Sequence, residues 1–135
     1  MTTDPDAASR PGDPSGPPAG GLRVLVVDDE VCLCELACTW LEALGHVPVG
    51  VHSPAQALAR LDEGFDLLFT DIVMPGAMDG IALAHAAHLR YPHLRVLITS
   101  GYARSLLDGS RNLPGLMLPK PYRKADLEAA LREFR

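Results

Sequence analysis

A single acidic residue ends an apolar run within the segment Phe65–Pro75, and this arrangement constrains the fold more than any other feature of the chain. The run ends at Asp71, and a loop containing Pro75 and Gly76 follows. Open α/β sheets build ligand sites in this way, because a strand brings a side chain to its carboxyl end and the loop there receives the ligand. The segment therefore predicts an α/β sheet protein in which Asp71 is the reactive group.

Apolar runs and helical patterns alternate along the rest of the chain. We expect strands over 22–27, 46–51, 65–70, 94–99 and 115–118, and helices over 30–44, 53–63, 79–90 and 124–134. This alternation predicts a doubly wound, five-stranded parallel sheet of the flavodoxin-like (βα)5 type, in the order 2-1-3-4-5. The segment 102–113 could hold only a short helix, and we expect it to be mobile.

The two ends of the chain differ in composition. Residues 1–21 are rich in proline, glycine, aspartate and serine and predict a disordered tail, whereas residues 22–135 form the folded domain. The formal net charge of −5 argues against nucleic acid as a partner. No apolar run approaches the roughly 20 residues of a membrane span, and no signal peptide is visible, so we expect a cytoplasmic protein without a membrane partner.

The first predicted helix carries both an apolar face and all three cysteines. Helical spacing places these apolar residues on one face: Leu33, Leu36, Ala37, Trp40, Leu41 and Leu44. Cys32, Cys34 and Cys38 are expected to be reduced thiols rather than a disulfide framework. We expect Cys34 and Cys38 to lie beside the apolar stripe and to be partly exposed. They lie one turn apart and could bind a metal, although no histidine follows at ligand spacing.

The predicted strand order brings chemically active side chains to one edge of the sheet. The first and third strands are neighbours at the topological switch point, so Asp28 and Asp29 would meet Asp71 there. Three adjacent carboxylates repel one another, and Mg²⁺ relieves that repulsion while keeping waters and phosphate oxygens as further ligands. Thr99 adds a hydroxyl and Lys120 a cation. Such a set suits phosphoryl transfer onto a carboxylate.

Four motifs arrive in order at the ends of these strands: Val24–Glu30, Thr70–Gly76, Thr99–Gly101 and Lys120-Pro121. Together they resemble the receiver domain of two-component response regulators, over residues from about 22 to the C-terminus. The residues from Asp71 to Gly80 and from Leu118 to Tyr122 most resemble those of receivers attached to hybrid histidine kinases. The chain ends directly after the last predicted helix, so we expect a single-domain regulator without an output domain.

The resemblance implies a role for each acidic residue. Asp71 would accept a phosphoryl group from a phosphohistidine, supplied by a histidine kinase or a histidine phosphotransfer protein. Asp28, Asp29 and Asp71 would hold Mg²⁺, with the backbone carbonyl of Val73 as a further ligand. The protein would then be a phosphoacceptor that assists its own phosphorylation and dephosphorylation. It would act by changing its surface for a protein partner or as a phosphate sink in a phosphorelay.

The remaining implied roles concern the route of the signal. Lys120 would pair with the phosphoryl group, and its bond to Pro121 would be cis. Thr99 would move toward the phosphoryl oxygens. Many receivers carry an aromatic switch residue three positions before the lysine, but this chain has Met117 there. Tyr102 is a candidate to take its place.

Three other functions fit parts of the sequence less well. A flavodoxin-like cofactor binder needs a phosphate-holding loop after the first strand, where the acidic run Asp28–Glu30 would repel phosphate. A phosphohydrolase with an aspartyl nucleophile places two acids on the first strand with one residue between them, and usually carries a cap domain. A pseudo-receiver that binds partners without phosphate would not need all five site residues.

Overall fold

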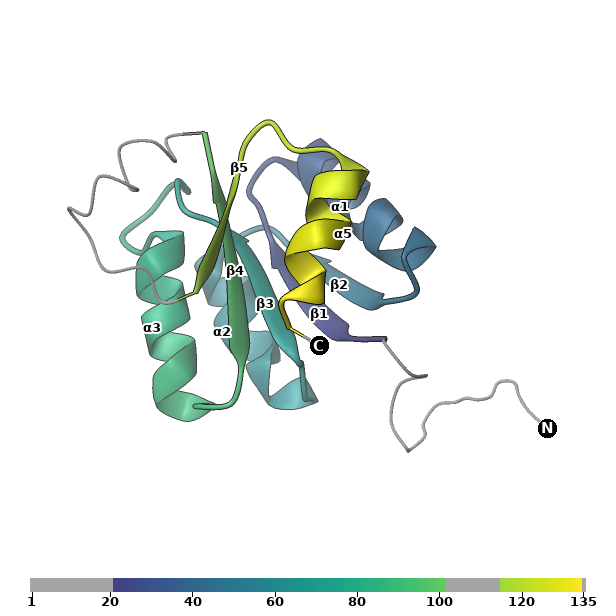
Figure 1. Cartoon of the computed structure of the whole chain (residues 1–135). Coiled ribbons are helices and arrows are strands. Elements are labelled where there is room, and N and C mark those ends of the chain that lie inside the picture. The colour runs from purple at the N-terminus through teal and green to yellow at the C-terminus, as the bar shows by residue number, and fades with distance from the viewer. Residues whose placement is uncertain (1–20, 102–114, 135) are drawn as a thin grey trace.

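A five-stranded parallel sheet forms the centre of the computed structural model, which describes residues 21–101 and 115–134 (Figure 1). The strands are β1 (Arg23–Val27), β2 (Val47–Val51), β3 (Leu67–Asp71), β4 (Arg95–Ser100) and β5 (Leu116–Pro119). Their order is β2-β1-β3-β4-β5, which confirms the predicted doubly wound topology. The predicted tail, the segment 102–113 and Tyr102 lie outside the described residues, apart from Gly21 at the end of the tail.

Helices cover both faces of the sheet (Figure 1). They are α1 (Val31–Ala43), α2 (Pro54–Arg60), the 3₁₀ turn η1 (Leu61–Glu63), α3 (Gly80–Arg90) and α5 (Lys124–Arg132). The side chains of α2 and α3 pack with one face of the sheet, and those of α1 and α5 pack with the other. Within the described part of the chain, no helix is long and apolar enough to span a bilayer.

The inner strands are buried on both faces. Val24, Leu25, Val26 and Val27 are almost inaccessible to solvent, and alternate residues of β1 enter the two opposite cores. Fully burying such a side chain contributes about 1.5–3 kcal/mol. This burial explains why the strand reads as a continuous apolar run without alternation.

Local sequence signals fix the helix ends. Ser53 caps α2 by accepting a hydrogen bond from the backbone N–H of Gln56. The Gln56 side chain accepts from the N–H of His52 rather than from that of Ser53, so the two residues form no reciprocal capping box. Gly64 follows η1 with φ of 87°, in the left-handed region that favours glycine.

The buried face of α1 differs from the predicted one. Leu33 and Leu36 are 40% and 43% exposed, whereas Cys34 is only 1% exposed and packs in the core with Ala37 and Leu41. The prediction that Cys34 would be partly exposed is therefore wrong. The helix is rotated so that its small cysteine side chain meets β2, and two leucines are left on the surface.

Candidate functional site

The carboxyl ends of β1 and β3 bring three acids together. Asp28 follows β1 and is 6% exposed, and Asp71 is the last residue of β3 and is 7% exposed. Asp29 is partly buried beside them, and one carboxylate oxygen from each of the three residues lies within 4.8 Å of the other two. The structure therefore places these three predicted residues in one cluster.

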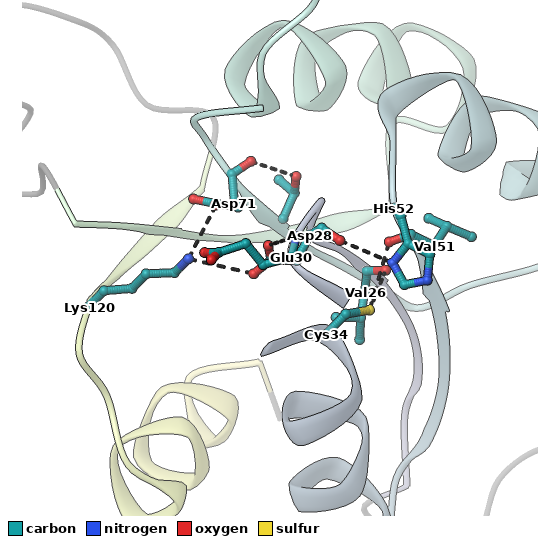
Figure 2. A network of polar contacts seen from close by, with 9 residues as sticks. Val26, Asp28, Glu30, Cys34, Val51, His52, Asp71 and Lys120 are labelled. Atoms are coloured by element: carbon teal, nitrogen blue, oxygen red, sulfur yellow. Dashed lines mark hydrogen bonds and ion pairs between the residues drawn. The ribbon is translucent and has the colours of Figure 1, made fainter. Parts of the chain in front are cut away.

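Lys120, which follows β5, neutralises part of this negative charge (Figure 2). Its Nζ lies 3.2 Å from Oδ2 of Asp71 and 3.5 Å from Oδ2 of Asp28. Burial lowers the pKa of Lys120, but the charges of Asp71 and Asp28 outweigh burial, so its pKa lies above the usual value. The ammonium group therefore stays protonated. Its peptide bond to Pro121 is cis, as the resemblance implied.

Burial also dominates at Asp71. It raises the pKa of the Asp71 carboxyl, while the nearby charge and hydrogen bond of Lys120 lower it and the charge of Asp28 raises it further. The net direction is upward, so the ionised carboxylate is held in an unfavourable environment. A cation placed at this cluster would relieve that cost.

Contacts with neighbouring backbone and side-chain groups hold the two buried acids in position (Figure 2). Oδ1 of Asp28 accepts a hydrogen bond of 2.9 Å from the N–H of Glu30. The backbone carbonyl oxygen of Asp28 lies 3.2 Å from Nδ1 of His52. On β3, the Thr70 hydroxyl donates to the carbonyl of Asp71 over 2.9 Å. Sequence reasoning missed these positioning contacts, because side-chain spacing does not show which backbone groups a side chain will meet.

Gly80 allows α3 to begin directly against the end of β3. A Cβ atom on this residue would lie 1.9 Å from the carbonyl oxygen of Asp71, much closer than any real contact. The N–H of Gly80 donates to the carbonyl of Ile72 over 2.8 Å, and Asp79 caps the helix by accepting from Ala82. The sequence predicted Asp79-Gly80 as a helix start but gave no sign of this close approach.

Thr99 lies in the same region, on the strand next to Asp71. It is buried and pairs with Asp71 in the register of β3 and β4. Its Oγ1 has no hydrogen-bond partner among the described residues. Buried hydroxyls are normally paired, so the site suits an occupant with an oxygen that accepts a hydrogen bond from Thr99.

An open crevice of about 510 Å³ lies beside the acid cluster and Lys120. It is lined by Asp29, Glu30, Asp71, Val73, Gly101 and Lys120. Val73 belongs to the loop after β3 and is 55% exposed, so the residue predicted to offer a backbone carbonyl does border the crevice. The crevice is open to solvent, so a small group can reach it from outside.

Tyr122 is a structural neighbour of the site that sequence reasoning missed. Its ring packs against Phe69 and Trp40, with centroids 5.8 Å and 6.0 Å away. Burial, followed by the charges of Asp28 and Asp71, raises the pKa of the Tyr122 phenol above its usual value. By contrast, Met117 at the expected switch position is partly buried against the core shared by α2 and α3.

The strand order and the buried acid cluster together define an open α/β sheet protein with an acidic site at its topological switch point. Comparison with known protein families then identifies the family. The response regulator receiver domain matches residues 24–132 of this chain. The chain belongs to this family. Its members act in two-component signalling, take phosphoryl groups from histidine kinases or phosphotransfer proteins, and generally bind Mg²⁺ at the acidic site.

Two curated relatives illustrate the similarity. The chain is 35% identical over 108 residues to the response regulator receiver protein CpdR of Brucella abortus, covering 78% of this chain and 89% of CpdR. It is 34% identical over 113 residues to the transcriptional regulatory protein CpxR of Escherichia coli. That match covers 82% of this chain but 47% of CpxR, so the chain spans about half of that relative.

Solved structures agree with the fold. The receiver domain of the hybrid histidine kinase CckA superimposes with a TM-score of 0.70 at 28% identity, covering 83% of this chain and 97% of that one. This neighbour supports the predicted likeness to receivers of hybrid kinases. The response regulator TrrA of Thermotoga maritima, in complex with Mg²⁺ and BeF, gives a TM-score of 0.75 at 24% identity over 84% of this chain and 98% of that one, which supports the fold alone.

Proposed function

We propose that this protein is a single-domain response regulator that accepts a phosphoryl group from a phosphohistidine onto Asp71. The observation that carries the proposal is the buried carboxylate of Asp71, held between two further acids and 3.2 Å from Nζ of Lys120. The match to CpdR, a receiver protein, extends over 89% of that relative and supports the receiver role. Acetyl phosphate and Mg²⁺ test the proposal, and a chain that gains no phosphoryl group under these conditions contradicts it.

The acid cluster fits a hard divalent cation. Asp28, Asp29 and Asp71 offer oxygen ligands within 4.8 Å of one another, which is the donor chemistry that Mg²⁺ prefers. The carbonyl of Val73 would complete the protein ligands. When bound, Mg²⁺ neutralises phosphoryl oxygens and relieves repulsion among the acids.

The other two site residues have distinct roles in this proposal. The carboxylate of Asp71 attacks phosphorus, and the phosphohistidine nitrogen leaves, so one P–O bond forms as one P–N bond breaks. Lys120 holds its ammonium group near the oxygens of the transferred group. The buried hydroxyl of Thr99 gains a phosphoryl oxygen as acceptor, which supplies the partner that it lacks among the described residues.

Mg²⁺ is expected to raise the melting temperature of the wild-type chain. At a concentration 100 times the dissociation constant, binding to the folded state adds about 2.7 kcal/mol to the free energy of unfolding. Asp28→Asn and Asp29→Asn should lose most of this increase, whereas Asp62→Asn, an exposed acid in η1, should keep it. Thermal melting with and without MgCl₂ measures the effect. An equal increase in all four proteins would show that the cation does not bind at the cluster.

The exposed apolar residues of α1 provide the proposed docking surface for the phosphodonor. Leu33, Leu36 and Trp40 line a cavity of about 460 Å³ together with Lys120 and Tyr122. This apolar cavity therefore adjoins the acidic crevice through Lys120, which lines both. A helical phosphohistidine protein that covers the leucines would bring its imidazole close to Asp71.

Leu36→Glu should impair phosphorylation by a protein donor but not by a small-molecule donor. We expect phosphotransfer from a phosphohistidine protein that phosphorylates the wild-type chain to fall about tenfold, which corresponds to about 1.4 kcal/mol. Phosphorylation by acetyl phosphate, which needs no docking surface, should be unchanged. Leu89→Glu is the matched control, because Leu89 is an 87% exposed leucine on α3. If both variants respond alike to the protein donor, α1 is not the docking surface.

A further inference from the structure

The end of β2 contacts the backbone of Asp28 at two consecutive positions. The N–H of Asp28 donates to the carbonyl oxygen of Val51 over 3.2 Å. The carbonyl oxygen of Asp28 lies 3.2 Å from Nδ1 of His52 (Figure 2). A carbonyl oxygen can only accept a hydrogen bond, so Nδ1 of His52 carries the hydrogen. Both peptide groups that flank the Cα atom of Asp28 are therefore fixed to the end of β2.

We propose that His52 is a positioning residue that sets the affinity of the acid cluster for a divalent cation. The carbonyl that His52 contacts belongs to the peptide unit that joins Asp28 to Asp29, and both of these acids belong to the cluster. A peptide unit is planar and rigid, so a contact with its oxygen also fixes the direction of its N–H and the two Cα atoms. The inference rests on the proposed Mg²⁺ site and adds a group that does not itself touch the ion.

The side chain of Asp28 depends on the same backbone geometry. Its Oδ1 accepts a hydrogen bond of 2.9 Å from the N–H of Glu30, and its Oδ2 lies 3.5 Å from Nζ of Lys120. The first contact requires the chain to turn directly after Asp28, and the peptide unit between Asp28 and Asp29 is part of that turn. A rotation of this unit would displace the carboxylates of both acids relative to Asp71, and cation binding would then have to restore their positions at a cost in free energy.

His52 is itself held from two sides. Its N–H donates to Oε1 of Gln56 over 2.7 Å, and the N–H of Gln56 donates to Oγ of Ser53 over 3.1 Å. The preceding residue, Val51, is buried and pairs with Val27 in the register of β1 and β2. The imidazole is therefore placed by the buried end of β2 and by the start of α2.

Calorimetric titration of the full-length chain with MgCl₂, without a phosphodonor, tests this role. His52→Ala should raise the dissociation constant about tenfold, the lower end of the loss typical when a group that orients a metal ligand is removed. His52→Asn should stay within about threefold of the wild-type value, because its amide nitrogen occupies the same δ position as the donating ring nitrogen. His52→Gln carries its amide one bond further out and should behave like His52→Ala. His93→Ala is the matched control, because His93 is an exposed histidine before β4, and it should leave the constant unchanged.

The set of variants distinguishes this role from a purely structural one. A loss of affinity in His52→Ala that His52→Asn restores, with thermal melting showing that both are folded, would support the proposal. Equal dissociation constants in the wild type and folded His52→Ala would overturn it, as would an equal loss in His52→Asn and His52→Gln. A wild-type chain that binds no Mg²⁺ would contradict the proposed cation site and this inference together.

The tautomer of His52 provides a second measurement that does not depend on a cation. In long-range ¹H–¹⁵N correlation spectra of the wild-type chain without Mg²⁺, neutral His52 should carry its hydrogen on Nδ1 and none on Nε2, because the contact with the Asp28 carbonyl selects that form. His93→Ala should leave the His52 signals in place and identify the signals of His93. A neutral His52 that carries its hydrogen on Nε2 cannot donate to Asp28, and that result would overturn the proposal.

Discussion

Asp71→Asn is expected to abolish phosphorylation of the chain by acetyl phosphate in the presence of Mg²⁺. The amide is nearly isosteric with the carboxylate but has no oxygen able to attack phosphorus. A gel that retards phosphorylated protein, together with intact mass, should detect no phosphoryl adduct on the variant. The wild-type adduct should be released by hydroxylamine, which cleaves acyl phosphates.

Two controls distinguish loss of chemistry from loss of structure. Asp62→Asn removes an exposed acid and should be phosphorylated like the wild type. Because burial raises the pKa of Asp71, the folded protein pays a cost for ionising it at neutral pH, so Asp71→Asn should melt at or above the wild-type temperature. That cost disappears as the pH falls below the raised pKa, and the difference between the two proteins should shrink there. An adduct that persists in Asp71→Asn would refute the assignment of the acceptor.

Gly80→Ala is expected to be the most damaging single-methyl change near the site. Its Cβ would lie 1.9 Å from the carbonyl oxygen of Asp71 and 2.9 Å from Cα of Ile72, and both neighbours are backbone atoms that cannot rotate away. The start of α3 must then move off the end of β3. We expect the free energy of unfolding to fall by about 3 kcal/mol, measured by urea denaturation, and phosphorylation to fall with it.

Gly101→Ala is the matched control for this change. Gly101 also borders the crevice, but an added Cβ there meets no atom of the described residues within 4 Å. Its free energy of unfolding should stay within about 0.5 kcal/mol of the wild-type value, as for most surface substitutions. If both variants lose the same free energy of unfolding, the close approach of α3 to β3 is not the cause of the loss in Gly80→Ala.

Most of the site could be predicted because its parts lie at the ends of apolar runs. Asp28, Asp71 and Thr99 each occur where such a run stops, and the alternation of strands and helices fixes the order in which those ends meet. Neither step needs knowledge of side-chain packing. The resemblance then supplied roles for the residues that the topology had already gathered.

The orientation of α1 could not be predicted in the same way. Apolar spacing identified a stripe through Leu33 and Leu36, but the helix instead buries Cys34 against β2. That choice depends on Gly50, which leaves room for two sulfur atoms and lies far away in the sequence. Helical periodicity contains no information about such a partner. Leu33 and Leu36, for which the periodicity predicted burial, are instead exposed beside the crevice. There they are available for contact with a docking partner.

The same limit applies to Gly80 and Tyr122. A glycine after an aspartate reads as an ordinary helix start, and the need for the missing side chain appears only when α3 lies against the carbonyl of Asp71. Tyr122 reads as a loop residue, yet its ring fills the space between Phe69 and Trp40. Both are tertiary contacts that depend on how the elements pack, which no local pattern encodes.

The chain contains one tryptophan, and its position allows intrinsic tryptophan fluorescence to report on the site. The indole of Trp40 meets the ring of Tyr122 edge-on, with an interplanar angle of 69°. Tyr122 lies two residues after the lysine that contacts Asp71, and Trp40 and Lys120 line the same cavity. The fluorescence of this single tryptophan can therefore be followed during titration with a cation or phosphodonor, without attaching a dye to the chain.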